Sequence, residues 1–151
     1  MLFRSIRELI DFKPDHQGTD ITQALRYFTQ VIKKRCTAFL FTDFYDHNFQ
    51  DALKIASRKH DLIAIRITDP RESEIPDMGL VKVKHAETGN ITWVDTADAR
   101  VREYFRKKAI AHQNELNDLF NRSGIDWTQI RVDEDYVKPL MKLFRKRESR
   151  K

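Results

Sequence analysis

Two patterns of apolar residues alternate along the chain, and their order predicts the architecture. Helical spacing of apolar positions predicts helices over residues 2–11, 20–34, 48–59, 97–122 and 136–144. Short apolar runs predict strands at residues 38–42, 62–67 and 127–132. The first two runs are almost unbroken, which is typical of strands that are buried on both faces.

The order of these elements predicts an α/β fold. Strand, helix and strand follow one another between residues 38 and 67, as in a βαβ unit with parallel strands and a right-handed crossover. Residues 80–84 and 91–95 alternate between apolar and polar side chains on either side of a Gly-containing turn, which indicates a β-hairpin. We therefore expect one domain with an open, mostly parallel sheet flanked by helices and one β-hairpin. In the last helix, the residues expected to face inward are Val137, Leu140, Met141 and Phe144.

The composition narrows the setting. Of the 151 residues, 40% are hydrophobic and 34% are charged, which fits one core under a well-solvated surface. Cys36 is the only cysteine, so an internal disulfide and a multi-cysteine zinc site are excluded, and a reducing, cytoplasmic setting is expected. No apolar stretch is long enough to span a bilayer, so any membrane anchor of the native protein would lie outside this chain.

The formal net charge is +5, and much of the excess lies in a basic tail over residues 145–151. A basic tail can bind nucleic acid or an anionic surface. The alternative is a solvated helix end, where cations also interact favourably with the helix dipole. We favour the helix end and expect no nucleic-acid binding, because no aromatic-interleaved basic patch accompanies the tail.

Acidic residues stand where the first two strands end, and ligands of open parallel sheets bind beyond such ends. Asp43 follows the first strand, Asp46 comes shortly after it, and Asp69 follows the second strand. The hydroxyl of Thr19 and the carboxylate of Asp43 are oxygen ligands of the kind that Mg²⁺ prefers. The alternative is structural, since Thr19 and Asp20 can serve as helix caps and a strand-end Asp is often a turn former.

Three other kinds of site are not present in the sequence. The chain has no Gly-rich phosphate-binding loop, so it is not itself a nucleotide hydrolase. Ser57, Ser73 and Ser123 lack a nucleophile elbow, and the histidines form no zinc pair at helical spacing.

Several segments resemble known families. Residues 18–25, Gly-Thr-Asp-Ile-Thr-Gln-Ala-Leu, resemble the threonine loop of von Willebrand factor A domains, and residues 39–44, Phe-Leu-Phe-Thr-Asp-Phe, resemble their following strand with its terminal aspartate. A narrower resemblance, to the bacterial domain-of-unknown-function 58 family, lies in residues 69–72 and 74–79, 88–89 and 93–96, and 132–137 and 139–140. The resemblance covers residues 2–144 and implies a partial von Willebrand factor A or Rossmann-like fold.

The resemblance implies a metal-ion-dependent adhesion site in which Thr19 and Asp43 are ligands. Such a site also needs a D-x-S-x-S motif at the end of the domain's first strand, and this sequence has none. We therefore interpret residues 1–151 as a single, N-terminally incomplete domain that carries a partial site. Mg²⁺ or Mn²⁺ is expected only in the complete domain, and no metal in this chain. The resemblance further implies a MoxR-type AAA+ ATPase as partner and, in the native protein, an N-terminal membrane anchor.

These observations together predict a non-enzymatic module that binds or scaffolds proteins through its strand-end site. The rival hypothesis is a Mg²⁺-dependent phosphoesterase or nuclease, which would need Asp43, Asp46 and Asp69 within one coordination sphere. The missing first strand should also leave an unpaired edge at residues 38–42. We expect a homodimer through this sheet edge, because unpaired strands pair with other chains.

Overall fold

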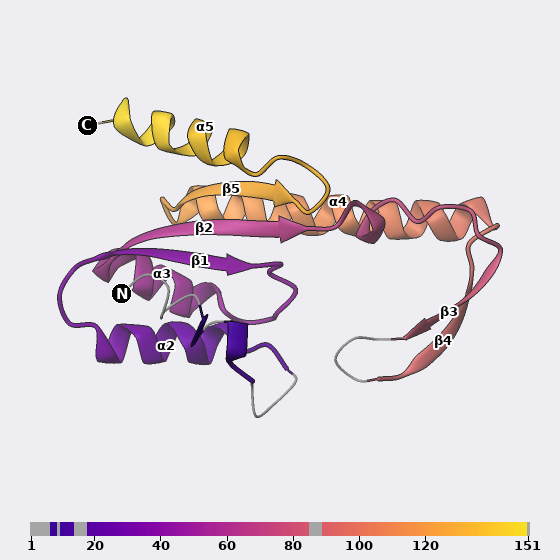
Figure 1. The fold of residues 1–151 in the computed structure, drawn as a ribbon, viewed down its shortest axis with the longest axis horizontal. Coiled ribbons are helices and arrows are strands. Elements are labelled where there is room, and N and C mark those ends of the chain that lie inside the picture. The colour runs from indigo at the N-terminus through magenta and orange to yellow at the C-terminus, as the bar shows by residue number, and fades with distance from the viewer. Residues whose placement is uncertain (1–6, 9, 14–17, 85–88, 151) are drawn as a thin grey trace.

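The computed structural model describes residues 7, 8, 10–13, 18–84 and 89–150 (Figure 1). Its main sheet contains three parallel strands in the order β1 (Thr37–Thr42), β2 (Asp61–Thr68) and β5 (Asp126–Arg131). A separate antiparallel hairpin pairs β3 (Leu80–Lys84) with β4 (Ile91–Asp95). The α/β fold class and the hairpin expected from the sequence are confirmed.

Helices cover both faces of the sheet. Those with described bounds are α2 (Ile21–Val31), α3 (Gln50–Lys59), α4 (Ala99–Arg122) and α5 (Val137–Glu148), with the short 3₁₀ helix η1 (Pro70–Glu72) after β2. One core cluster joins α2, α3 and α4 to one face of β2, and a second, smaller cluster joins α5 to the other face. In Figure 1, α5 lies alone on its side of the sheet.

Local sequence signals explain where α2 and α4 begin and where α4 ends. The side chain of Asp20 accepts a hydrogen bond of 2.7 Å from the backbone N–H of Gln23, which caps the start of α2. Asp98 caps α4 in the same way through the N–H of Arg100. Gly124 follows the end of α4 with a φ of +62°, a left-handed conformation that glycine adopts at little cost.

The prediction that both long apolar runs are buried on two faces is right for β2 and wrong for β1. Ile63 and Ile65 of β2 are each 1% exposed. Their partners in the register of β1, Phe39 and Phe41, are 44% and 60% exposed. The reason is that α5 packs mainly against β5 and β2 and reaches this face of β1 through an edge-on contact between Phe144 and Phe39, whose ring centroids are 6.3 Å apart. The described helices therefore leave much of this face of β1 uncovered.

The inward face predicted for the last helix also needs correction. Leu143 is the buried residue of α5, and Leu140 packs beside it. Val137, Met141 and Phe144, which were expected to face inward, are 48%, 47% and 39% exposed. Because α5 covers only part of the sheet, its buried stripe is narrower than the apolar periodicity indicates.

Two parts of the fold extend away from the sheet. The first half of α4 runs beyond the carboxyl ends of the strands, and the β3–β4 hairpin lies at its far end (Figure 1). The buried residues of α4, Leu116 and Phe120, both belong to its second half. Most of the helix expected over residues 2–11 lies outside the described residues. No helix within the described ranges is long and apolar enough to cross a membrane.

Candidate functional site

The loop that follows β1 is tied to the start of α2. The carboxylate of Asp46 accepts hydrogen bonds from the backbone N–H groups of Ile21, at 2.7 Å, and His47, at 2.6 Å. The hydroxyl of Thr22 donates to the carbonyl of Asn48 at 3.3 Å. Residues 43–49, which connect β1 to α3, are therefore held against the first turn of α2.

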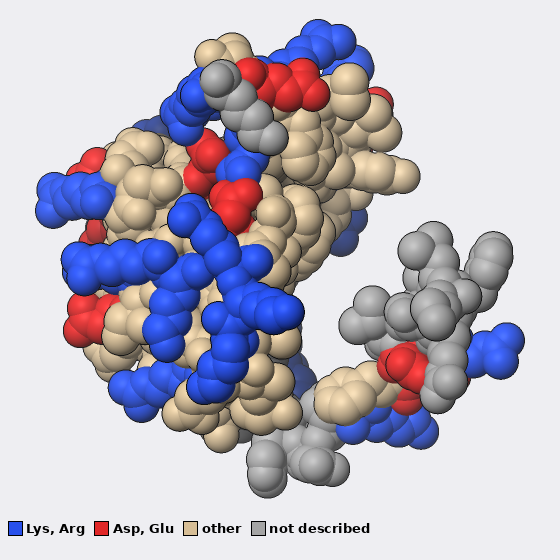
Figure 2. Space-filling view, turned by 90° about the vertical axis from the view of Figure 1, so that its left-hand side faces the viewer, with Lys and Arg blue, Asp and Glu red and all other residues tan. Residues whose placement is uncertain are grey.

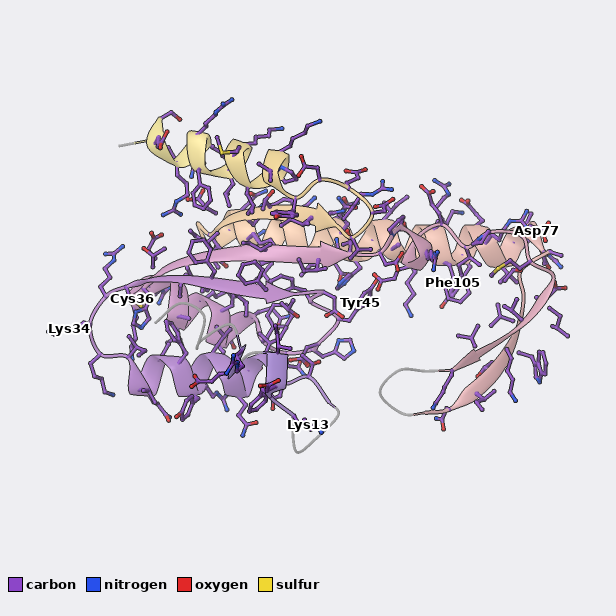
Figure 3. The ribbon with its side chains drawn as sticks, in the orientation of Figure 1. Lys13, Lys34, Cys36, Tyr45, Asp77 and Phe105 are labelled. Atoms are coloured by element: carbon purple, nitrogen blue, oxygen red, sulfur yellow. The ribbon has the colours of Figure 1, made fainter. Side chains whose placement is uncertain are left out.

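A buried aromatic ring fixes the conformation of the same loop. Phe44 and Asn48 have φ values of +62° and +64°, which are uncommon for residues other than glycine. The ring of Phe44 is fully buried, with ring centroids 5.1 Å from Phe120 and 5.7 Å from Phe49. Packing of this ring stabilises the strained backbone. Tyr45 follows it and lies at the carboxyl end of the sheet (Figure 3).

The two residues predicted as metal ligands lie on the segments that this bonding joins. Thr19 is exposed and immediately precedes Asp20, the cap of α2. Asp43 is exposed at the end of β1, and its Oδ1 accepts a hydrogen bond of 3.2 Å from the backbone N–H of Tyr45. The helix-capping role considered for Asp20 is thus observed, and Asp43 stabilises the turn in which it lies.

The three acids of the rival hypothesis each hold a backbone N–H group. Asp69 Oδ1 accepts from the N–H of Arg71 at 2.9 Å and caps η1, while Asp43 and Asp46 act as described above. Within the described ranges, no group of three or more His, Cys, Asp or Glu side chains is placed to hold a metal ion. The geometry therefore does not assemble a cluster of the kind that two-metal or three-carboxylate phosphoryl chemistry uses.

The same end of the sheet contains a feature that the sequence reasoning missed. Arg66 lies on β2 and is 5% exposed, and its Nε has no hydrogen-bond partner. It borders a cavity of about 80 Å³ between the ends of β2 and β5, the middle of α4 and η1. The available signal was a charged residue inside an apolar run that was expected to be buried on both faces.

Burial, together with nearby charges, shifts the pKa values of three residues around Arg66. Burial raises the pKa of the Tyr45 hydroxyl, with a contribution from Glu72, and Arg66 opposes that rise. Partial burial and the charges of Asp43 and Asp69 raise the pKa of Glu72. Burial, assisted by the charge of Arg66, lowers the pKa of His112, whose ring stacks on Tyr45 with centroids 4.7 Å apart. These residues thus form one electrostatically coupled group.

The opposite end of the sheet is basic. Figure 2 shows Lys and Arg side chains gathered on the end of the molecule where the strands begin. Part of the basic tail is engaged there. Arg147 Nη1 donates to Asp126 at 2.7 Å and Arg147 also bonds Asp61, while Arg150 bonds the other oxygen of Asp126 at 2.6 Å. These contacts fix the end of α5 to the first residues of β2 and β5, so this part of the tail is not the solvated helix end that was expected.

Comparison with known proteins places the chain in a family. Residues 1–115 match the family described as "Protein of unknown function DUF58", and the chain belongs to that family. It is 30% identical over 129 residues to "Uncharacterized protein MAV169" of Mycobacterium avium, an alignment that covers 85% of this chain and 76% of that protein.

The chain is also similar to longer mycobacterial proteins. It is 26% identical over 129 residues to "Uncharacterized protein Rv1480" of Mycobacterium tuberculosis and to "Uncharacterized protein Mb1516" of Mycobacterium bovis. These alignments cover 85% of this chain but 40% of each relative, so the chain spans well under half of their length. No solved structure matches the chain.

Proposed function

We propose that the chain is a protein-binding module whose partner contacts the carboxyl end of the sheet. The observation that carries this proposal is the gathering of three separate segments at that end: the first turn of α2, residues 43–49 and residues 69–74. Loops that a rigid scaffold positions in this way commonly carry binding residues. Carboxyl ends of parallel strands are also where open α/β sheets bind their ligands.

The loop geometry supports binding over catalysis. Asp43, Asp46 and Asp69 each use an oxygen to hold a backbone N–H group, so they stabilise the shape of the loops. A hydrolase of the rival kind would need those carboxylates to converge on one metal. Fixed loops that present polar side chains to solvent suit the recognition of a second protein.

The resemblance to von Willebrand factor A domains supplies the finer part of the proposal. By this resemblance Thr19 and Asp43 would be two ligands of a metal-ion-dependent adhesion site, and the Asp46–Ile21 hydrogen bond that joins their segments supports that assignment. We propose that they form a partial site, which a segment with a D-x-S-x-S motif would complete with Mg²⁺ or Mn²⁺. The partner that this resemblance implies is a MoxR-type AAA+ ATPase.

The proposal is tested by measuring the affinity of the chain for a purified MoxR-type ATPase by biolayer interferometry. Asp43→Ala should weaken binding by about tenfold, the equivalent of about 1.4 kcal/mol. Asp118→Ala is the matched control, because this exposed aspartate lies near the end of α4 that adjoins the opposite end of the sheet. Equal weakening by both variants, or no binding by the unmodified chain, would overturn the proposal.

A further inference from the structure

Arg66 is a buried cation without a counter-ion in contact. It is 5% exposed, and it forms no ion pair with any residue that the structure describes. Arginine is rarely buried to this degree unless it is paired, because removing a charge from water is costly. The unpartnered Nε shows that the hydrogen-bonding capacity of the guanidinium is not used up within the chain.

The surroundings of Arg66 are polar and leave room for a small group. The cavity of about 80 Å³ is bordered by Arg66, Thr68 and Gln129 on the sheet, Gln113 on α4, Glu72 on η1, and Tyr45. The amide of Gln129 donates to the hydroxyl of Thr68 at 3.0 Å, which fixes that wall. A space of this size holds a single functional group and not a drug-sized molecule.

The local charges define which group fits. Arg131, the second cation at the cavity, already donates to Asp133 at 2.9 Å and lies 3.2 Å from Glu134. Among the described residues Arg66 forms no ion pair, although it interacts with Tyr45 and with the nearby charge of Glu72, while Asp69, Glu72 and Glu74 make the rim acidic. A singly charged carboxylate matches one guanidinium, which can hold it with two parallel hydrogen bonds. A doubly charged phosphate would meet greater repulsion from the rim.

We propose that the cavity beside Arg66 binds one carboxylate group, and that in the assembled complex an acidic side chain of the protein partner supplies it. Only the source of the carboxylate rests on the proposed function, since the site itself belongs to this chain. The Nε atom is enclosed, so entry of the carboxylate requires a shift of the side chains around it, among which Tyr45 is 42% exposed.

The site is tested with formate as the probe and without any partner protein. In the ¹H–¹⁵N spectrum of the arginine Nε–H groups, sodium formate should shift the Arg66 signal saturably, against sodium chloride at the same ionic strength. The Arg122 signal is the internal control, because that side chain is 82% exposed and should not follow a saturable curve. An unchanged Arg66 signal would overturn the proposal, as would saturation by inorganic phosphate at a lower concentration than by formate.

A second measurement separates charge from geometry. Arg66→Lys keeps the positive charge but loses the planar pair of donors, so formate should raise the melting temperature of the unmodified chain and of Arg122→Lys but not of Arg66→Lys. An equal rise in Arg66→Lys would contradict the assignment, and the spectrum of the unmodified chain decides the question if that variant does not fold. If the unmodified chain does not bind formate, the carboxylate site is contradicted, and the binding of the ATPase is judged by its own experiment. Formate binding without ATPase binding contradicts only the source of the carboxylate.

Discussion

Asp46 and Ile21 stand 25 positions apart in the sequence, and the carboxylate of Asp46 accepts a hydrogen bond of 2.7 Å from the N–H of Ile21. This bond satisfies one of the N–H groups that the start of a helix leaves free, and it places a negative charge at the positive end of the helix dipole. The loop after β1 and the start of α2 therefore form one structural unit.

Removing this carboxylate should destabilise the fold. Asp46→Ala is expected to lower the free energy of unfolding by about 1 kcal/mol, as for the loss of a helix cap. Asp51→Ala is the control, because Asp51 is 93% exposed and its ion pair with Lys54 is a surface contact that contributes little. Urea unfolding of the three proteins makes the comparison, and an Asp46→Ala midpoint equal to that of Asp51→Ala would contradict the role of the bond.

The chain by itself should bind Mg²⁺ and Mn²⁺ weakly or not at all. The proposed partial site would offer one carboxylate, Asp43, and one neutral hydroxyl, Thr19, whereas hard divalent cations need more oxygen ligands than this for tight binding. Isothermal titration calorimetry measures the affinity. Submillimolar binding that Asp43→Ala abolishes would show that the site is complete without a D-x-S-x-S segment.

No hydrolysis of phosphoesters or nucleic acid is expected from the chain. Asp43, Asp46 and Asp69 are bonded within their loops, and the described part of the chain shows no group of acids arranged around a metal position. The assay uses a chromogenic phosphodiester and a nucleic-acid substrate with Mg²⁺ or Mn²⁺. Turnover that disappears in both Asp43→Asn and Asp69→Asn would favour the rival hypothesis of a phosphoesterase or nuclease.

The homodimer through the sheet edge stays a prediction. β1 pairs only with β2 among the described residues, and no charged residue lies within the strand. Unpaired N–H and C=O groups on such a strand favour pairing with another chain. Light scattering at micromolar concentration should give the mass of a dimer, and Phe39→Lys with Phe41→Lys should reduce it to that of a monomer. A monomeric unmodified chain whose mass these substitutions leave unchanged would show that the edge is not used.

The order of strands and helices could be predicted from the sequence, because apolar spacing follows directly from the geometry of each element. Whether helices cover both faces of a particular strand could not be predicted, since an unbroken apolar run does not reveal which helix packs on which face. Thus β2 is buried on both sides, while Phe39 and Phe41 of β1 stay largely exposed on the side that α5 covers only in part.

In the candidate site, too, some features could be predicted from the sequence and others could not. A cap at Asp20 and turn-forming roles for Asp43 and Asp69 follow from local rules, and all three are observed. The bond from Asp46 to Ile21 and the cavity at Arg66 depend on contacts between distant segments, which local rules do not supply. Arg66 interrupts an apolar strand, and this was the one sign in the sequence that a buried charge was present.

A protein partner that contacts the carboxyl end of the sheet should protect the backbone N–H groups there, and hydrogen–deuterium exchange with a MoxR-type ATPase measures this protection. On binding, exchange should slow in residues 19–23, 43–49 and 69–74, with residues 33–36 and 122–126 at the opposite end unchanged. Protection confined to that opposite, basic end, or no protection at saturating ATPase, would contradict the proposed contact.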